Sequence, residues 1–507
     1  MQKNILEELE KSETRLFVSR LLQQGCYYML QFVTIMLESF VLTSLLGGKY
    51  MQESIKFLPI VYLIQYDQAC FDEGWQSVCI QNFQLQNKVL PKCAPLGRQI
   101  FQACLYIVLA GLQKIIFNGF QIDPLFKSQY LLAVVLGIFS IFYSNLIAFF
   151  NATQRQFYLS TSKMLSSIII LFFILFSYSF SYPAKNLTST WPSGVAKPLV
   201  ELCIGACVFL AIKKGRIIMT SIKLDITEAC VVVISAKEKF VHLVKQISVS
   251  AVYFTFNSSR PVVVLDAVRT IMLLPASSKR DYQLMDLFIY NIGQVMLALF
   301  GKMVYLSIIQ LSPSMFSLKR FTQLKKYLMI SAIAGTVFSE IVAGVFVLMP
   351  FLIFSLVLNG LADSSMTAYY ESKTYMKIIR TNAFLYATDA LQQVPVAFAM
   401  VTGKHYVVVV MGILRIIGGL YIVETGSKQL GAILDYGNTF FYFEILCLVI
   451  AVVFCGYCFV CFKTEYVEPK QKKEAQKAKT PSSVSLPIIQ VDGKSFTASQ
   501  SNIEVDI

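Results

Sequence analysis

Acidic side chains inside long apolar stretches are the residues of this sequence whose types and positions can do chemistry. The densest group is Asp67, Asp72 and Glu73, in the stretch YDQACFDEGWQ. Several other apolar stretches carry an acid: Glu38, Asp266, Asp286, Glu340, Asp389 and Glu444. A charge in hydrocarbon costs about 2.5–3.5 kcal/mol on insertion scales, so each of these acids is a functional hypothesis. Buried carboxylates can take up and release protons, and they attract cationic ligands.

Basic residues near these acids offer a structural alternative. Arg260, Asp266 and Arg269 share the stretch SRPVVVLDAVRTIMLL, in which Asp266 can pair with either arginine. Glu38 has no base close to it in the sequence, which favours a functional role. Lys302 can reach the membrane edge or pair with an acid on another helix. An ion pair and a coupling site both remain open for Asp266.

Motifs of soluble enzymes do not occur in the sequence. There is no P-loop, no GxGxxG after a strand and no HExxH. The two histidines, His242 and His405, lie beside predicted membrane edges and are interpreted as interfacial residues. Three cysteines with metal-like spacing have no His or Asp near them, which favours packing or palmitoylation: Cys455, Cys458 and Cys461. We therefore expect no enzyme, no cofactor and no metal site.

Long apolar segments must position these residues. The chain has 507 residues, of which 56% are hydrophobic and 15% charged, a composition that excludes a soluble multidomain protein. A membrane-crossing helix needs about 20 apolar residues. About twelve segments meet this length: 23–46, 57–80, 99–119, 129–150, 158–181, 196–212, 246–272, 284–309, 328–352, 378–401, 406–423 and 438–462. Each is too long for a barrel strand and lacks strict alternation, so we predict an all-α polytopic membrane protein.

The positions of lysine and arginine predict the orientation of the chain. The net charge is +14, and most basic residues outside the segments fall in alternate loops, which indicates cytosolic N- and C-termini. This orientation places the sequon at Asn186 outside, as a glycosylation candidate. The predicted organisation has five parts: a cytosolic N-terminus (1–17), an N-terminal six-helix bundle (18–212), a cytosolic basic connecting loop (213–245), a C-terminal six-helix bundle (246–463) and a disordered cytosolic tail (464–507).

Local motifs across nearly all of 15–462 resemble those of the eukaryotic multidrug and toxin extrusion (MATE) transporters. SVCIQNFQLQNK is similar to the Cys-Gly-Gln-Ala-Phe-Gly-Ala stretch that ends the family's second helix, with Gln81 in register. GRQIF resembles the Gln-Arg start of the third helix, and IDPLFKSQY resembles the family's Asp-Pro followed by Tyr. Asp389, Gln392 and Gly403 keep the spacing of the family's Asp, Gln and Gly in helix ten.

The seventh helix of the family also has a counterpart, with departures. SRPVVVLDAVRTIMLL resembles the stretch in which Pro is followed by Cys-Leu-Glu, and this resemblance places Asp266 at the first helix-seven glutamate. The second glutamate falls on Ile271, and the helix-two glycines fall on Ile80 and Gln84. The stretch SIIQLSPS lacks the usual Arg-Val-Ser-Asn. The sequence is therefore identified as a divergent member of the family.

The resemblance implies two six-helix bundles around a central cavity and an antiporter that alternates between the two sides. It implies export of organic cations, xenobiotics or metabolites in exchange for H⁺ or Na⁺, with no nucleic acid partner. Asp389 lies toward the outer end of its segment, which favours a cavity mouth or gate. The candidate ion-coupling and substrate residues are Asp266, Glu38, Asp72, Glu73, Glu340, Asp389, Gln81 and Gln392.

Two other functions remain open at this point. A lipid-linked oligosaccharide flippase of the same superfamily needs a basic cavity, which Arg260, Arg269 and Lys302 can supply. A receptor or scaffold that does not transport would act through the tail at 464–507. A major-facilitator transporter is excluded because its Gly-Asp-Arg signature between helices two and three is absent. The expected location is the plasma membrane or a vacuolar membrane.

Overall fold

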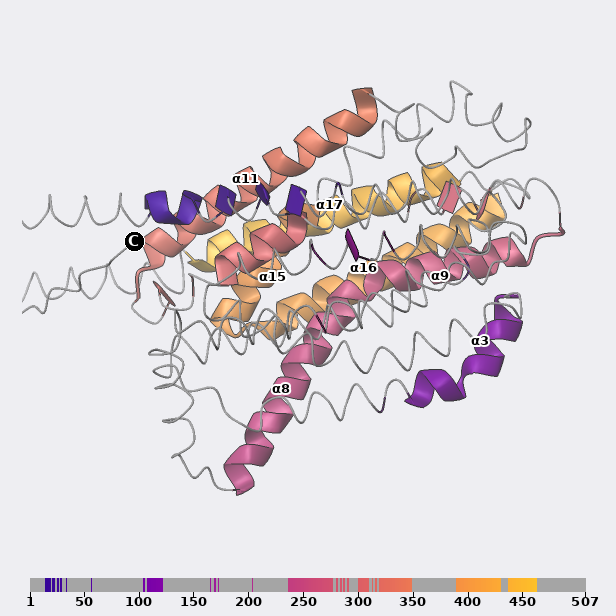
Figure 1. The fold of residues 1–507 in the computed structure, drawn as a ribbon, viewed down its shortest axis with the longest axis horizontal. Helices are drawn as coiled ribbons and strands as arrows, with labels where there is room; N and C mark the ends of the chain where they lie inside the picture. Colours follow the sequence, from indigo (N-terminus) through magenta and orange to yellow (C-terminus); the bar gives the residue numbers. More distant parts are fainter. Residues whose placement is uncertain are drawn as a thin grey trace, which may run out of the picture. The chain divides into compact units, whose positions relative to one another are not determined.

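The structure, a computed structural model, describes mainly the second half of the chain. Residues 107–121, 236–276, 300–309, 319–348, 389–429 and 436–462 are described without a gap, and shorter groups lie within 14–33, at 56 and 104, and within 165–203 and 280–316. The helices are α3 (Gln113–Gly119), α8 (Ala236–Asn257), α9 (Ser259–Met272), α11 (Phe321–Leu348), α15 (Asp389–Thr402), α16 (His405–Gln429) and α17 (Tyr436–Cys461) (Figure 1). No strand occurs among the residues just named, so the predicted all-α class is confirmed.

Helices α8 and α9 follow each other directly, with only Ser258 between them, and the chain bends where they meet (Figure 1). Helical hydrogen bonds continue through the turn: the Ser258 N–H donates to the Phe254 carbonyl (2.8 Å) and the Val262 N–H to the Ser258 carbonyl (3.0 Å). Pro261 lies in the first turn of α9, where a missing N–H costs little. The chain therefore passes from α8 to α9 with little loss of backbone hydrogen bonding.

The observed helices extend beyond several of the predicted segments. Helix α8 begins at Ala236, ahead of the predicted start at 246, because AKEKFVHLVK contains good helix formers that need no hydrocarbon around them. Helix α16 likewise continues to Gln429, past the predicted end at 423. The boundary at 213–245 stays a prediction, because most of that segment lies outside the described residues.

A glycine separates α15 from α16. Gly403 has a φ of 76°, a left-handed conformation that glycine adopts without the steric cost of a Cβ atom. Helix α15 itself continues through Pro395. The two helices can therefore reverse direction over two residues and lie against each other.

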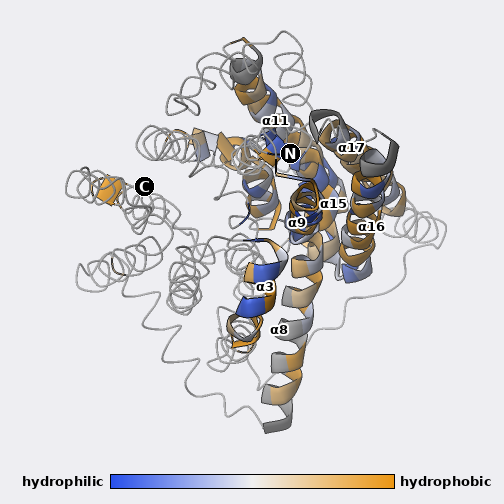
Figure 2. Ribbon diagram, turned by 90° about the vertical axis from the view of Figure 1, so that its right-hand side faces the viewer, coloured by the Kyte–Doolittle hydropathy of each residue, from blue (hydrophilic) through white to orange (hydrophobic). Residues whose placement is uncertain are grey.

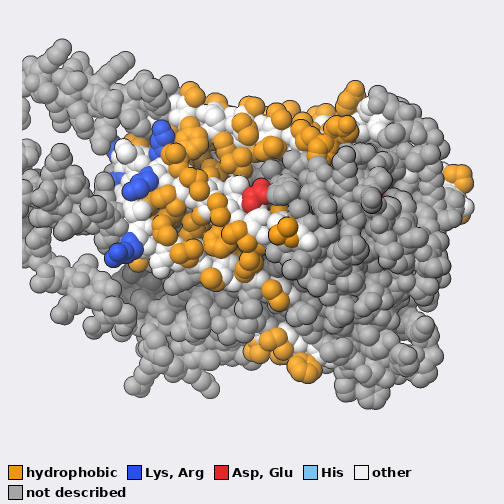
Figure 3. Space-filling model, turned by 90° about the horizontal axis from the view of Figure 1, so that it is seen from above, with side chains coloured by type: hydrophobic (Ala, Val, Ile, Leu, Met, Phe, Trp, Pro, Cys, Tyr) orange, Lys and Arg blue, Asp and Glu red, His pale blue; other side chains and the backbone are white. Residues whose placement is uncertain are grey.

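Three helices among the described residues are long and apolar enough to cross a membrane: Phe321–Gly344 in α11, His405–Gly426 in α16 and Thr439–Cys461 in α17. Exposed apolar side chains on these helices include Ile333 and Val337 of α11. Figure 2 shows the hydrophobic colouring along α11, α16 and α17. Figure 3 shows such a surface, with Lys and Arg side chains gathered at one end of it. This arrangement suits a lipid-facing surface with a charged edge. The total of twelve helices stays a prediction, because the remaining segments lie wholly or partly outside the described residues.

Helix α16 lies at the centre of the packing that positions the site. It contacts α8, α9 and α15, and α15 also contacts α11. A Cβ atom on Gly412 would lie 2.7 Å from the Thr255 carbonyl oxygen of α8, so only glycine lets the two backbones approach so closely. Gly419 allows the same kind of approach to Val263 of α9 and Phe443 of α17. Small residues on α16 thus bring four helices together.

Candidate functional site

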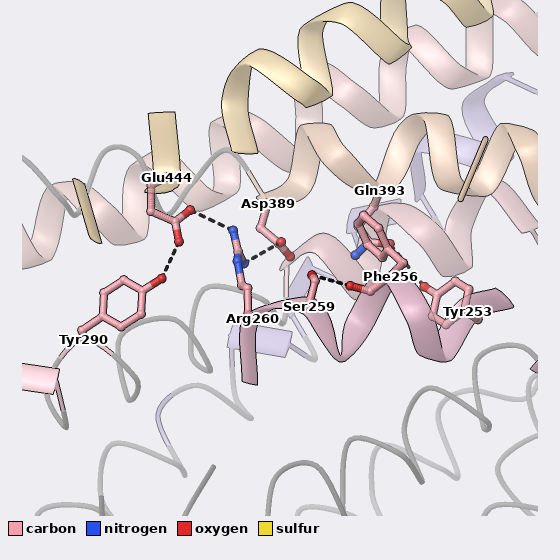
Figure 4. A network of polar contacts seen from close by, with 8 residues as sticks. All are labelled: Tyr253, Phe256, Ser259, Arg260, Tyr290, Asp389, Gln393 and Glu444. Carbon is pink, nitrogen blue, oxygen red and sulfur yellow. Dashed lines mark hydrogen bonds and ion pairs between the residues drawn. The ribbon is translucent and has the colours of Figure 1, made fainter. Parts of the chain in front are cut away.

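A buried ion-pair network joins α9, α15 and α17 (Figure 4). The Arg260 guanidinium donates through Nη1 to Asp389 Oδ1 at 2.7 Å and through Nη2 to Glu444 Oε2 at 2.8 Å. The side chains of Arg260, Asp389 and Glu444 are 12%, 6% and 0% exposed. A planar guanidinium suits this position because its fork of N–H groups reaches two carboxylates at once. We call these three residues and Tyr290 the charge cluster.

Tyr290 completes the surroundings of Glu444. Its hydroxyl donates a hydrogen bond of 2.6 Å to Glu444 Oε1, the carboxylate oxygen that Arg260 does not contact (Figure 4). The Tyr290 ring lies against the Phe440 ring, with 4.0 Å between the centroids. Phe440 is one helical turn before Glu444 on α17, so the same helix holds both the acid and the ring that orients its partner.

The second carboxylate oxygen of Asp389 lies against a glycine. A Cβ atom on Gly301 would be 2.5 Å from Asp389 Oδ2 and 3.1 Å from Gln393 Cγ. Glycine at this position therefore leaves room for the carboxylate. The apolar helix Phe300–Ile309 thus closes the side of the cluster that Arg260 does not cover.

A second buried arginine lies beside the cluster. Arg415 of α16 is buried, and its guanidinium carbon lies 4.5 Å from the centroid of the Phe256 ring, in a cation–π contact. It interacts with Cys447 and is close enough to Arg260, Asp389 and Glu444 to interact with their charges. The described groups at this place therefore include two guanidinium groups and two carboxylates.

Polar contacts continue from the cluster along α8 and α15. The Tyr253 hydroxyl donates to Gln393 Oε1 at 3.2 Å, and the Ser259 hydroxyl donates to the Phe256 carbonyl at 2.6 Å (Figure 4). Gln392 is fully buried, and its amide oxygen and nitrogen have no hydrogen-bond partner among the described residues. The polar face of α15 thus includes one side chain whose hydrogen-bonding groups are left open.

Solved structures with the same arrangement of helices cover almost the whole chain. No protein-family model matches the sequence, and no curated protein matches it. The MATE multidrug transporter DinF-BH, solved as a complex, matches 89% of this chain and 96% of its own with a TM-score of 0.64 at 12% identity. The Vibrio cholerae MATE transporter VcmN in its bent form covers 89% of this chain and 97% of its own, with a TM-score of 0.61 at 12% identity.

This chain has the MATE transporter fold. A MOP superfamily transporter from Pyrococcus furiosus agrees with this conclusion, with a TM-score of 0.60 over 88% of this chain and 95% of its own at 10% identity. The resemblance inferred from sequence motifs is thereby confirmed at the level of the fold, and so is the polytopic membrane architecture.

Within the MATE fold, Asp266 lies outside the charge cluster. It is half-buried on α9, and its Oδ1 lies 3.7 Å from Nη1 of Arg269, whose side chain is 70% exposed. Of the two arginine partners considered from the sequence, the structure pairs Asp266 with Arg269. Arg260 precedes Asp266 by six residues, and at about 3.6 residues per turn these two side chains leave the helix on different faces.

The other predicted site residues divide into two groups. Glu340 is half-buried on α11, whereas Asp389 and Gln392 are buried on α15. The remaining candidates lie outside the described residues: Glu38, Asp72, Glu73, Gln81 and the sequon residue Asn186. Cys455 and Cys458 are buried, and the Cys455 thiol donates to the Leu391 carbonyl at 3.6 Å.

Arg260 and Glu444 stand out in the sequence as charges in apolar segments, but sequence reasoning does not assign them to a coupling site. Their pairing joins residues 184 positions apart, and Tyr290 is 154 positions from Glu444. One available signal is charge balance, because a buried arginine in a membrane segment requires acidic partners. In the structure Arg260 has two acidic partners, Asp389 and Glu444. They lie on other helices, and no local sequence motif predicts that these helices contact α9.

Proposed function

We propose that the protein is a secondary active transporter that exports organic cations, xenobiotics or metabolites in exchange for H⁺ or Na⁺ by alternating access. The observation that carries the proposal is a buried cluster of charges held between helices of a MATE fold. Charges inside a membrane protein are costly and usually line pathways or sites. The likeness to the multidrug transporter DinF-BH supports a small-molecule substrate.

The proposed transport cycle uses the two acidic positions of α9 and α15 differently. Asp266, half-buried beside an exposed arginine, takes up the coupling ion from outside, which weakens the hold on a cationic substrate and releases it. Asp389 helps to set the conformation through its ion pair with Arg260 on another helix.

In this proposal the protein is a membrane transporter and not an enzyme. Both termini lie in the cytosol, and the protein is located in the plasma membrane or a vacuolar membrane.

The test is Asp266→Asn in proteoliposomes loaded with a fluorescent organic cation. We expect export under an imposed pH gradient to fall about 5- to 150-fold, the range of a typical coupling free energy. Glu424→Gln separates the effect of a nearby charge from that of Asp266 itself, because Glu424 is an exposed carboxylate on α16 whose charge acts on Asp266. Its export should fall less than that of Asp266→Asn. Undiminished proton-driven export by Asp266→Asn would contradict the proposed coupling role.

A lipid-linked oligosaccharide flippase is the second candidate. Arg415 favours it, because this buried guanidinium makes no ion pair among the described residues and its Nε has no hydrogen-bond partner there. The Pyrococcus furiosus transporter is described as having a binding pocket of reverse polarity that suggests a different function. In the same liposomes, movement of a fluorescent pyrophosphate-linked lipid without export of the cation would select the flippase.

A further inference from the structure

Three of the four carboxylate oxygens of the charge cluster already accept a hydrogen bond. Asp389 Oδ1 and Glu444 Oε2 accept from Arg260, and Glu444 Oε1 accepts from Tyr290. The fourth oxygen, Asp389 Oδ2, is packed against Gly301. A metal cation such as Na⁺ needs several oxygen ligands in place of its water shell. Among these four oxygens only Asp389 Oδ2 could bind such a cation without competing with a hydrogen bond, and one oxygen is too few.

Charge also opposes a free cation at this place. Arg260 puts a positive group within 2.8 Å of both carboxylates, and the charge of Arg415 acts on the same groups. A cation that approached the two acids would meet a guanidinium in direct contact with them. Repulsion between like charges is strong where water is excluded.

From this geometry we propose that Arg260 is a built-in cation that occupies the two-carboxylate site and closes it to Na⁺. The specificity of the site then depends on one side chain. When Arg260 is removed, the described charged groups at this place are two buried carboxylates and the guanidinium of Arg415. The vacated position lies within reach of an oxygen from each acid. Na⁺ is the ion that fits a small, oxygen-lined site with an excess of negative charge.

This inference deepens the proposed transport function, because it implies that the cluster would not couple transport to Na⁺. Only this consequence rests on the proposed function. The exclusion of Na⁺ rests on the contacts of Arg260 with the two carboxylates and can be measured without a transport assay. Thermal unfolding of the purified full-length protein in detergent is compared in NaCl, KCl and choline chloride at equal ionic strength. A ligand that binds only the folded state raises the Tm.

The decisive variant is Arg260→Gln, and Arg269→Gln is its matched control. Both change an arginine of α9 that is paired with an acid, but Arg269 is exposed and outside the cluster. We expect Arg260→Gln to gain a Na⁺-specific rise in Tm about 2 °C or more above that of the unmodified chain. Arg269→Gln should gain none, and Arg260→Gln/Asp389→Asn should lose the gain.

A Na⁺-specific shift in Arg260→Gln that equals the shift of the unmodified chain would overturn the proposal. If Arg260→Gln folds only when prepared in NaCl, and not in KCl, the proposal is supported. If it folds in neither salt, Arg260→Met carries the test, because this variant keeps both carboxylates and replaces the arginine by an apolar side chain that fills much of its space. A Na⁺ shift in Arg260→Met no larger than that of the unmodified chain also overturns the proposal. Failure of export in liposomes would not change these Tm comparisons. It would contradict only the proposed transport function.

Discussion

At the scale of single residues, the charge cluster is a set of groups that are stable only together. Arg260 is nearly buried, and both of its acidic partners are on other helices. Removing one member of a buried ion pair typically costs about 3–5 kcal/mol, because the remaining charge stays in the interior without a partner. Loss of either acid therefore affects stability as well as any function of the site.

The hydrogen bond from Tyr290 to Glu444 can be measured by a double-mutant cycle. Tyr290→Phe removes only the hydroxyl, and a hydrogen bond to a charged acceptor contributes about 1.5–3 kcal/mol. We expect Tyr290→Phe to lower the free energy of unfolding by an amount in this range and to lower it less in the Glu444→Gln background. Chemical denaturation in detergent gives the four values of the cycle.

The matched control for that cycle is another tyrosine hydroxyl. Tyr406 and Tyr457 share a hydroxyl–hydroxyl contact of 2.6 Å, but both rings are exposed. Water replaces such a contact easily, so Tyr406→Phe should change the free energy of unfolding by less than about 0.5 kcal/mol. Equal effects of Tyr290→Phe and Tyr406→Phe would mean that burial adds nothing to the Glu444 contact.

The sequence indicated the members of the cluster better than their partners. Asp389 is selected because an acid in an apolar segment is costly, whereas the sequence offers Arg260 a local pair with Asp266. The helical period already disfavours that pair, whereas Arg269, one turn away, is in reach. Contacts such as that of Arg260 with Asp389 depend on which helices pack together. The local sequences of α9 and α15 do not predict that these two helices lie close to each other.

At the scale of the helices, close packing of α16 on α8 sets the frame of the site. Gly412→Ala places a methyl group 2.7 Å from a backbone oxygen that cannot rotate away. We expect a loss of about 1–3 kcal/mol in the free energy of unfolding, the usual cost of overpacking. Thermal or chemical unfolding in detergent measures it.

Gly456 of α17 provides the control for Gly412. A Cβ atom on Gly456 meets no atom within 4 Å, so Gly456→Ala adds a methyl group without a clash. Its effect on the free energy of unfolding should stay within about 0.5 kcal/mol or be favourable, because alanine stabilises a helix interior relative to glycine. A Gly412→Ala protein as stable as Gly456→Ala would show that the α8–α16 contact relaxes freely.

For the three candidate spans among the described residues, hydropathy located the span but not the ends of the helix. The apolar part of α16 is predicted at 406–423, and the helix runs from His405 to Gln429. An apolar window reports what lies in hydrocarbon, whereas a helix continues into water wherever its residues favour it. The close approach at Gly412 is likewise not predictable, since a glycine in an apolar segment does not reveal its neighbour.

At the scale of the whole molecule, the proposed transport function depends on the helices of the MATE fold and not on the tail at 464–507. A chain that ends at Thr464 keeps α17, which ends at Cys461, and should keep at least about half of the cation export. A chain that ends at Ile450 cuts α17 and should fail to fold or to transport. Export measured in proteoliposomes compares the two. Loss of export in the longer chain would favour a receptor or scaffold that works through the tail.

The span of the charge cluster along the chain has a consequence for biosynthesis. Asp389 follows Arg260 by 129 residues and Glu444 follows it by 184. At about 5–20 residues per second, a ribosome needs roughly 10–40 s to reach Glu444 after Arg260 has been made. During that interval a growing chain carries an arginine in a membrane segment before its partners exist. Arg260 therefore has no acidic partner of the cluster until α15 has been synthesised, and the cluster is complete only after α17 has followed.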